Sequence, residues 1–324
     1  MSEYTLGPLP WSEQTLQEAY WRDFRKARES IKEHPAHDLH ERTLSLRAVL
    51  RMFNGAAQSF VSTRGQFQTE VHGGGLLHRN RRDHRQAFEE KFQEILYLFA
   101  SAAMTLVDQS RALSKKVKLR GYTEHVSCSF RENPRHRFIQ ELRNDLIHVT
   151  LHRPSWNLRI AREGTQTTRF MLYPDQLRQR SKEWHQLAIE YLRQHPKGVD
   201  LGLLIQEYRL EVSQFQEWLQ ESVHTAAGEA IDDYLRCDRF FRAIESRCHW
   251  RLLLSQIVIP KSLDPYQYLN RYLTLTEFAE IEHLPHRSKD QVDRIIEFVD
   301  EYHACDAELR SLVYKAFGVS TSKT

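Results

Sequence analysis

Apolar residues recur at the three- and four-residue spacing of amphipathic helices along most of this 324-residue chain. Helices are expected at about residues 12–32, 38–61, 83–116, 134–152, 181–194, 201–223 and 226–259, with shorter ones between 263 and 317. Gly and Pro are scarce, at 12 and 10 residues, which also favours helix. The pattern therefore predicts an all-α helical bundle.

Two segments interrupt the helical pattern before residue 180. A glycine-rich loop is expected from Gly65 through residues 73–75 into the basic string at 79–85. Residues 156–160 and 168–173 alternate between apolar and polar side chains on either side of a turn. This alternation predicts a small β-hairpin insertion at about 156–173.

A cluster of turn-forming residues at 194–198 is the best candidate for a domain boundary. The chain is accordingly expected to consist of a helical domain at 1–195, with its core at 38–155, and a C-terminal helical extension at 196–324. The sequence does not indicate a role for the extension.

The net charge of +3 is a difference between two oppositely charged parts of the chain. Residues 1–199 carry 32 Lys and Arg against 22 Asp and Glu, a net +10, whereas residues 200–324 carry 14 against 21, a net −7. Within the basic part, residues 111–159 hold eleven Lys and Arg against four acids. Such a surface suits a phosphate-backbone ligand, although a solvated face of an arginine-rich protein has the same composition.

The composition gives no sign of a metal site or a disulfide framework. The four cysteines form no CxxC pair and have no zinc-ligand spacing. The tightest histidine cluster, His34, His37 and His40, straddles a proline and lacks a set of carboxylates, so no metal or other cofactor is expected. The chain starts without a leader pattern and has no apolar run long enough for a membrane span, which predicts a cytoplasmic protein.

The helix expected at 134–152 carries the most informative residues of the chain, at positions 143–148. Its apolar residues form one stripe at about 100° per residue: Ile139, Leu142, Leu146 and Val149. Asn144, His148 and His152 lie on the opposite face. Arg143 lies at the edge of the stripe, so its long stem must bend round the helix to join His148.

A polar face of this kind is either solvated surface or part of a site. It combines a fixed cation, an amide and a titratable imidazole, which suits metal-free phosphodiester cleavage. A single helix offers only one such histidine, and acid-base transesterification works best with two proton-handling groups. A two-fold dimer that packs these faces together would supply the second, so a composite site in a homodimer is expected.

The arrangement Arg143-Asn144-xxx-His148, on a helix that follows a long amphipathic helix and precedes Pro154, resembles the HEPN superfamily (higher eukaryotes and prokaryotes nucleotide-binding domain). The hallmark of that family is Arg, then four to six residues, then His, with a polar residue directly after the Arg. The resemblance covers roughly residues 38–155. It implies a helical bundle that dimerises through the motif helices and often acts as a metal-independent endoribonuclease in toxin-antitoxin, abortive-infection and other antiviral systems.

The resemblance implies Arg143, Asn144 and His148 as the catalytic residues. His148 would transfer protons, Arg143 would stabilise the transition state, and Asn144 would orient His148 or bind the phosphate. Candidate RNA-binding residues, chosen for charge and position, are His152, Arg153, Arg79, Arg81, Arg82, Lys115 and Lys116.

Two functions of different classes remain open at this point. The first is an endoribonuclease that acts as a toxin or antiviral effector, with RNA as substrate and an antitoxin or sensor protein as a further candidate partner. The second is a non-catalytic HEPN-like module that binds nucleotides, RNA or another protein. No membrane partner is expected.

Overall fold

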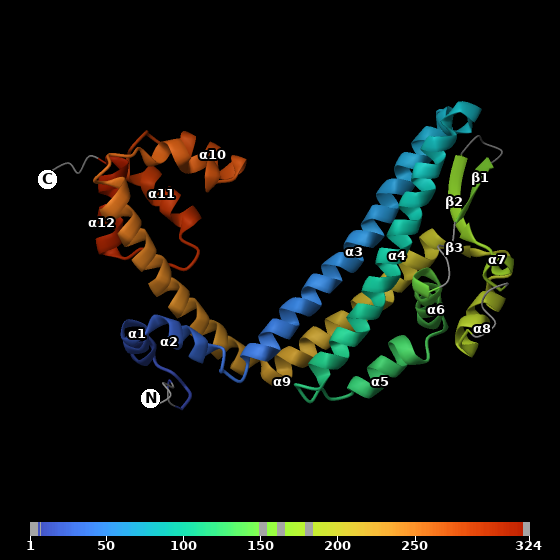
Figure 1. The fold of residues 1–324 in the computed structure, drawn as a ribbon, viewed down its shortest axis with the longest axis horizontal. Helices are drawn as coiled ribbons and strands as arrows, with labels where there is room; N and C mark the ends of the chain where they lie inside the picture. Colours follow the sequence, from blue (N-terminus) through green and yellow to red (C-terminus); the bar gives the residue numbers. More distant parts are fainter. Residues whose placement is uncertain (1–5, 7, 149–153, 161–165, 179–183, 320–324) are drawn as a thin grey trace. The chain divides into compact units, whose positions relative to one another are not determined.

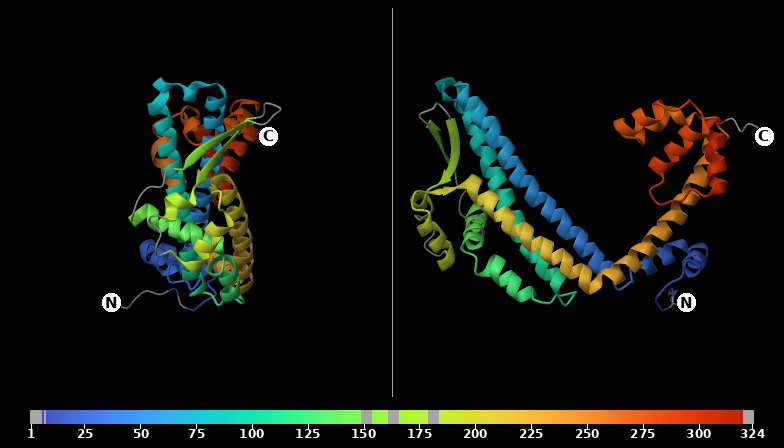
Figure 2. Two further views of the ribbon diagram at one scale, coloured as in Figure 1. Left: turned by 90° about the vertical axis from the view of Figure 1, so that its right-hand side faces the viewer. Right: turned by 180° about the vertical axis from the view of Figure 1, so that it is seen from behind.

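The computed structural model describes residues 6, 8–148, 154–160, 166–178 and 184–319. Helices make up most of this part of the chain, and its strands form one small three-stranded sheet (Figure 1, Figure 2). The prediction of an all-α protein with a small β insertion is therefore confirmed. The chain divides into two compact units: a central unit of Asp38–Gly228, and a terminal unit of Met1–His37 with Glu229–Thr324. The boundary expected at 194–198 lies inside the central unit.

Two long helices, α3 (His37–His72) and α4 (Arg82–Ser114), frame the central unit and lie side by side in both views (Figure 1, Figure 2). Two short 3-10 turns, η1 (Gly75–Leu77) and η2 (Arg79–Arg81), connect them. Aromatic rings join the two helices: Phe53 stacks on Phe99 with 4.7 Å between centroids, and Phe60 meets Phe92 edge-on at 5.5 Å. Such pairs add to the free energy that burial of the rings already provides.

The loop expected to start at Gly65 begins later, because α3 continues to His72. A glycine inside a helix costs about 1 kcal/mol relative to alanine. The buried side chains of Phe67 and Val71 offset that cost, and the Phe67 ring contacts the Phe92 and Phe170 rings. The expectation was therefore wrong at Gly65 and correct for residues 73–75, where the chain turns.

After α4 the chain forms α5 (Tyr122–Val126), a π-helical turn η3 (Ser127–Arg131) and α6 (Pro134–His148), the helix that carries the motif. The expected hairpin follows as β1 (Ser155–Ile160) and β2 (Gln166–Leu172), which pair antiparallel with Ser155 opposite Met171. Helices α7 (Pro174–Arg178) and α8 (Gln186–Gln194) come next. The two-residue strand β3 (Val199–Asp200) adds to β2, with Val199 opposite Leu172, and was not predicted.

Other helix boundaries also differ from the expectations. The helix expected at 12–32 divides at Asp23, which is extended and caps the second part by accepting from the backbone N–H of Lys26. The helices expected at 201–223 and 226–259 are one helix, α9 (Leu201–Leu252), followed by a π-helical turn, η4 (Leu253–Val258). The junction at residues 224–228 contains two alanines, Ala226 and Ala227, and no proline, so the helix continues through Gly228.

The terminal unit contains α1 (Glu13–Arg22), α2 (Phe24–Ile31) and the second half of α9. It also contains η5 (Pro265–Arg271), α10 (Leu275–Glu282), α11 (Lys289–Val299) and α12 (Ala307–Phe317). One apolar cluster joins the N-terminal helices to α9, and another joins the C-terminal helices to one another. Within the described residues, no helix combines the length and the apolar character that a bilayer crossing requires.

Candidate functional site

Helix α6 starts with a side-chain cap and buries one face in the central unit. The Asn133 Oδ1 atom accepts from the backbone N–H groups of Arg135 at 2.9 Å and His136 at 3.2 Å, and Pro134 occupies the first turn. The apolar stripe expected on this helix is buried where the structure describes it, at Ile139, Leu142 and Leu146, and Phe138 is buried as well. These residues fix which side of α6 faces the rest of the unit.

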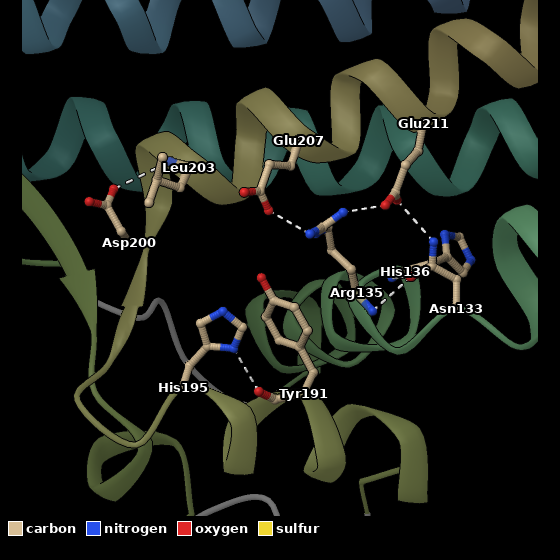
Figure 3. A network of polar contacts seen from close by, with 9 residues as sticks. All are labelled: Asn133, Arg135, His136, Tyr191, His195, Asp200, Leu203, Glu207 and Glu211. Atoms are coloured by element: carbon tan, nitrogen blue, oxygen red, sulfur yellow. Dashed lines mark hydrogen bonds and ion pairs between the residues drawn. The ribbon is translucent and has the colours of Figure 1, made fainter.

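A network of ion pairs ties the first turn of α6 to α9 (Figure 3). Arg135 donates to Glu207 at 2.5 Å and also pairs with Glu211. Asn133 donates from Nδ2 to the same Glu211 at 2.9 Å. Tyr191 of α8 lies beside Arg135, and burial raises the pKa of its hydroxyl above the usual value. By bridging two glutamates one helical turn apart, Arg135 holds α6 at a set position along α9.

The motif residues Arg143 and Asn144 contact each other. Arg143 donates from Nη1 to Oδ1 of Asn144 at 3.3 Å, and Asn144 donates from Nδ2 to Oε2 of Glu141 at 3.5 Å. Both motif side chains are half-buried. The guanidinium of Arg143 therefore reaches the polar side of α6, as the expected bend of its stem requires.

Arg143 and Asn144 also line a pocket of about 130 Å³ between α4, η3 and α6. The pocket is rich in cations: its lining includes Arg111, Arg131, Arg137 and Arg143 against a single carboxylate, Asp108. Amide groups of Gln140 and Asn144 complete the polar lining, and all of these residues belong to the central unit. The basic composition of residues 111–159 is thus partly gathered into one concave site.

His136 lines the same pocket but is not suited to proton transfer near neutral pH. Burial, followed by the positive charges of Arg137 and Arg111, lowers its pKa to about 3. Its Nδ1 atom is hydrogen-bonded to the hydroxyl of Tyr208 at 2.7 Å. Burial holds the pKa of that hydroxyl well above its usual range, so Tyr208 stays neutral too. This histidine acts in packing and hydrogen bonding.

Three of the predicted site residues are only partly described or lie outside the description. His148 is the last residue of α6, one helical turn after Asn144, and its side chain lies outside the described part of the structure. His152 and Arg153 lie outside the described residues altogether. The meeting of Arg143 with His148 therefore stays a prediction.

The remaining RNA-binding candidates lie at opposite ends of α4. Arg79 and Arg81 are in η2 and Arg82 begins α4, whereas Lys115 and Lys116 directly follow its last residue. A helix of 33 residues is about 50 Å long at 1.5 Å per residue, so the two groups cannot form one patch. Lys115 is one turn from Arg111 of the pocket, and Lys116 pairs with Asp38 at 2.8 Å. The side chain of Arg79 lies outside the description.

The structure adds residues that the sequence did not single out. Asp145, inside the motif, is buried and accepts from Nε1 of Trp184 at 3.4 Å. Glu141 accepts from the backbone N–H of His185 at 3.1 Å. Both contacts connect α6 to the segment that leads into α8. Glu141 and Asp145 are four residues apart and therefore lie on the same face of α6. This spacing was the only signal in the sequence that both could contact one neighbouring segment.

The histidine cluster near the N-terminus is structural where it is described. His34 Nε2 lies 3.3 Å from Oδ2 of Asp233, and its Nδ1 accepts from the backbone of Ala36. His37 Nδ1 lies 2.9 Å from the hydroxyl of Tyr234. Across the described residues, no three His, Cys, Asp or Glu side chains gather as metal ligands would.

Comparison with known proteins found no family model, no curated protein and no solved structure that matches this chain.

Proposed function

We propose that this protein is a metal-independent endoribonuclease of HEPN type that acts in the cytoplasm as a toxin or antiviral effector. The observation that supports the proposal best is the contact between Arg143 and Asn144 at the edge of a pocket lined by three further arginines. The guanidinium groups of Arg137 and Arg143 are half-buried, so they bind phosphate oxygens more strongly than solvated ones would, because little water screens them. RNA is the substrate that combines such phosphates with an internal nucleophile.

In the proposed reaction the 2′-hydroxyl of RNA attacks the adjacent phosphorus. The new bond joins O2′ to phosphorus, the bond from phosphorus to O5′ breaks, and the products are a 2′,3′-cyclic phosphate and a 5′-hydroxyl. Arg143 binds the non-bridging oxygens and stabilises the charge that develops on them. Asn144, which accepts a hydrogen bond from Arg143, orients the guanidinium. This role differs from both expected ones, in which Asn144 orients His148 or binds the phosphate.

Proton transfer is assigned to His148 of two protomers. One imidazole accepts the proton of the 2′-hydroxyl, and the other donates a proton to the departing O5′. Because His136 stays neutral down to about pH 3, it is not a substitute for the second group. The proposal therefore retains a homodimer through α6, and an antitoxin or sensor protein would control it.

Cleavage of a labelled oligoribonucleotide in the presence of EDTA tests the proposal. The wild-type protein should produce 5′-hydroxyl and 2′,3′-cyclic phosphate ends. General acid-base catalysis contributes about 100- to 10,000-fold, so His148→Ala should lower the rate by a factor in that range. Arg51→Ala, which removes an exposed arginine of α3, is the matched control. Undiminished cleavage by folded His148→Ala would refute the assignment.

A non-catalytic binding module is the alternative, and one observation favours it. The pocket beside Arg143 and Asn144 is lined by α4, η3 and α6 of a single chain, so a phosphate can be bound without a second protomer. A protein that binds RNA or a nucleotide as a monomer, and cleaves nothing at any concentration, would have this function. Sedimentation measured alongside the cleavage assay separates the two cases.

A further inference from the structure

The pocket between α4, η3 and α6 carries an excess of positive charge that suits a dianion. Four guanidinium groups against one carboxylate give a formal charge of +3. The carboxylate found in the lining among the described residues, Asp108, is paired with Arg111 at 3.2 Å. Three arginines therefore act on any anion in the pocket without competition from a lining carboxylate.

Two of these arginines have unused hydrogen-bonding capacity. Arg143 lines the pocket, and its Nε is buried without a hydrogen-bond partner among the described residues. An unpaired buried donor of a charged group is destabilising unless a ligand supplies an acceptor. Arg131 is exposed, and among the described residues its guanidinium has no polar partner, while its backbone oxygen accepts from Nε of Arg137 at 3.0 Å. The pocket thus offers free donors on two different elements.

The size and walls of the pocket favour the end of a strand over its interior. The volume is about 130 Å³, and the apolar side chains of Met104, Val107 and Phe130 form part of the lining. These groups lower the local dielectric constant and so strengthen the attraction between the arginines and a phosphate. An internal phosphodiester carries a nucleotide on both sides and one negative charge. A terminal phosphomonoester carries one nucleotide and nearly two charges at pH 7.

We infer that this pocket binds the terminal phosphomonoester of an RNA strand, with Arg131, Arg143 and the donors of Arg111 that its pair with Asp108 leaves free as the main ligands. The inference rests on the proposed function in taking RNA as the ligand. It adds a substrate class: RNA that carries a phosphate at one end, held next to the helix that carries His148.

Fluorescence anisotropy with four versions of one oligoribonucleotide tests this inference: 5′-phosphorylated, 3′-phosphorylated, phosphorylated at both ends, and unphosphorylated. All are measured at one salt concentration, since affinity for nucleic acid depends on salt. At least one phosphorylated end should raise the affinity about tenfold or more, which corresponds to about 1.4 kcal/mol. The strand that shows the gain identifies which end is bound.

The variants Arg131→Ala and Arg111→Ala should remove most of that preference, because neither side chain is buried and neither change should disturb folding. Arg51→Ala, on α3 and away from the pocket lining, should keep it. Equal affinity of the wild-type protein for all four strands would overturn the inference, as would a preference that persists when both pocket arginines are removed. Failure of the ribonuclease proposal looks different: preferential binding of the phosphorylated strand with no cleavage of any strand.

Discussion

The side chain of Arg143 donates a hydrogen bond to Asn144, its neighbour in the chain, across 3.3 Å. Because successive residues on a helix point about 100° apart, only the bent stem of the arginine makes this contact possible. We expect Asn144→Ala to release the guanidinium and to lower kcat/KM for RNA cleavage about tenfold to hundredfold, as loss of one positioning hydrogen bond does. Asn144→Asp should also lower it, because a carboxylate would neutralise Arg143.

Steady-state cleavage rates with His148 intact measure this effect. Circular dichroism of both variants serves as the control for folding. If Asn144→Ala cleaves RNA as fast as the wild-type protein, Asn144 has no part in positioning Arg143.

Replacement of Arg135 by alanine should destabilise the central unit. The arginine side chain is 22% exposed and pairs with Glu207 and Glu211 of α9. Its loss leaves two neighbouring carboxylates without their shared cation, at a cost of about 2 to 3 kcal/mol. Urea denaturation followed by circular dichroism measures the change. Arg294→Ala removes an exposed arginine that also bridges two glutamates, and it should leave stability unchanged.

His136 should make the protein less stable in mild acid. Its pKa is about 3 in the folded state against about 6.5 in an unfolded chain, so the unfolded state binds the proton over the window between these values. Stability is therefore retained above pH 6.5 and falls as the pH drops toward 3. Between pH 7 and pH 5, this one residue should remove about 2 kcal/mol from the free energy of unfolding.

Urea denaturation at the two pH values tests the role of His136. In His136→Gln, the free energy of unfolding should fall by about 2 kcal/mol less between pH 7 and pH 5 than in the wild-type protein. The variant is less stable at pH 7 if the hydrogen bond to Tyr208 is lost. His78→Gln removes an exposed histidine of the same unit and should keep the full dependence of the wild-type protein. If the free energy of unfolding of His136→Gln depends on pH as strongly as that of the wild-type protein, this histidine is not buried in its neutral form.

Gln216→Leu should stabilise the protein. Gln216 is 3% exposed on α9, and neither its Oε1 nor its Nε2 has a hydrogen-bond partner among the described residues. Each unpaired polar atom costs about 1 kcal/mol or more, so leucine should raise the free energy of unfolding by about 1 to 2 kcal/mol. The midpoint of urea denaturation measures this gain in stability. Gln206→Leu, on the exposed side of the same helix, is the control and should leave the midpoint nearly unchanged.

A lower midpoint for Gln216→Leu would mean that the amide of Gln216 forms hydrogen bonds in solution.

The sequence predicted those parts of the fold that depend on local pattern. The stripe at Ile139, Leu142 and Leu146 is buried, and the hairpin forms where side chains alternate. The course of α3 through Gly65 was not predictable from local preference, because the rings that bury Phe67 come from distant segments.

In the candidate site, too, features set by helix geometry could be predicted, and features set by tertiary packing could not. Helix geometry predicted that the stem of Arg143 bends round the helix toward His148, but it did not predict the contact with Asn144. Nor did it predict the pocket, since Arg111 and Arg131 lie on separate elements that only the tertiary fold brings to α6. The neutral state of His136 depends on the same packing and could not be inferred from its place in the sequence.

The pairing of Arg135 with α9 has a consequence for how the motif could change in evolution. Arg135 fixes α6 at its first turn, and Arg143 lies eight residues later on the same rigid helix. Inserting or deleting one residue between them would rotate Arg143 and Asn144 by about 100° and shift them by about 1.5 Å. Both would leave the pocket while the anchor stayed in place. A change in the length of the helix between these two arginines therefore moves the whole motif, whereas a substitution there alters only the contacts of the replaced residue.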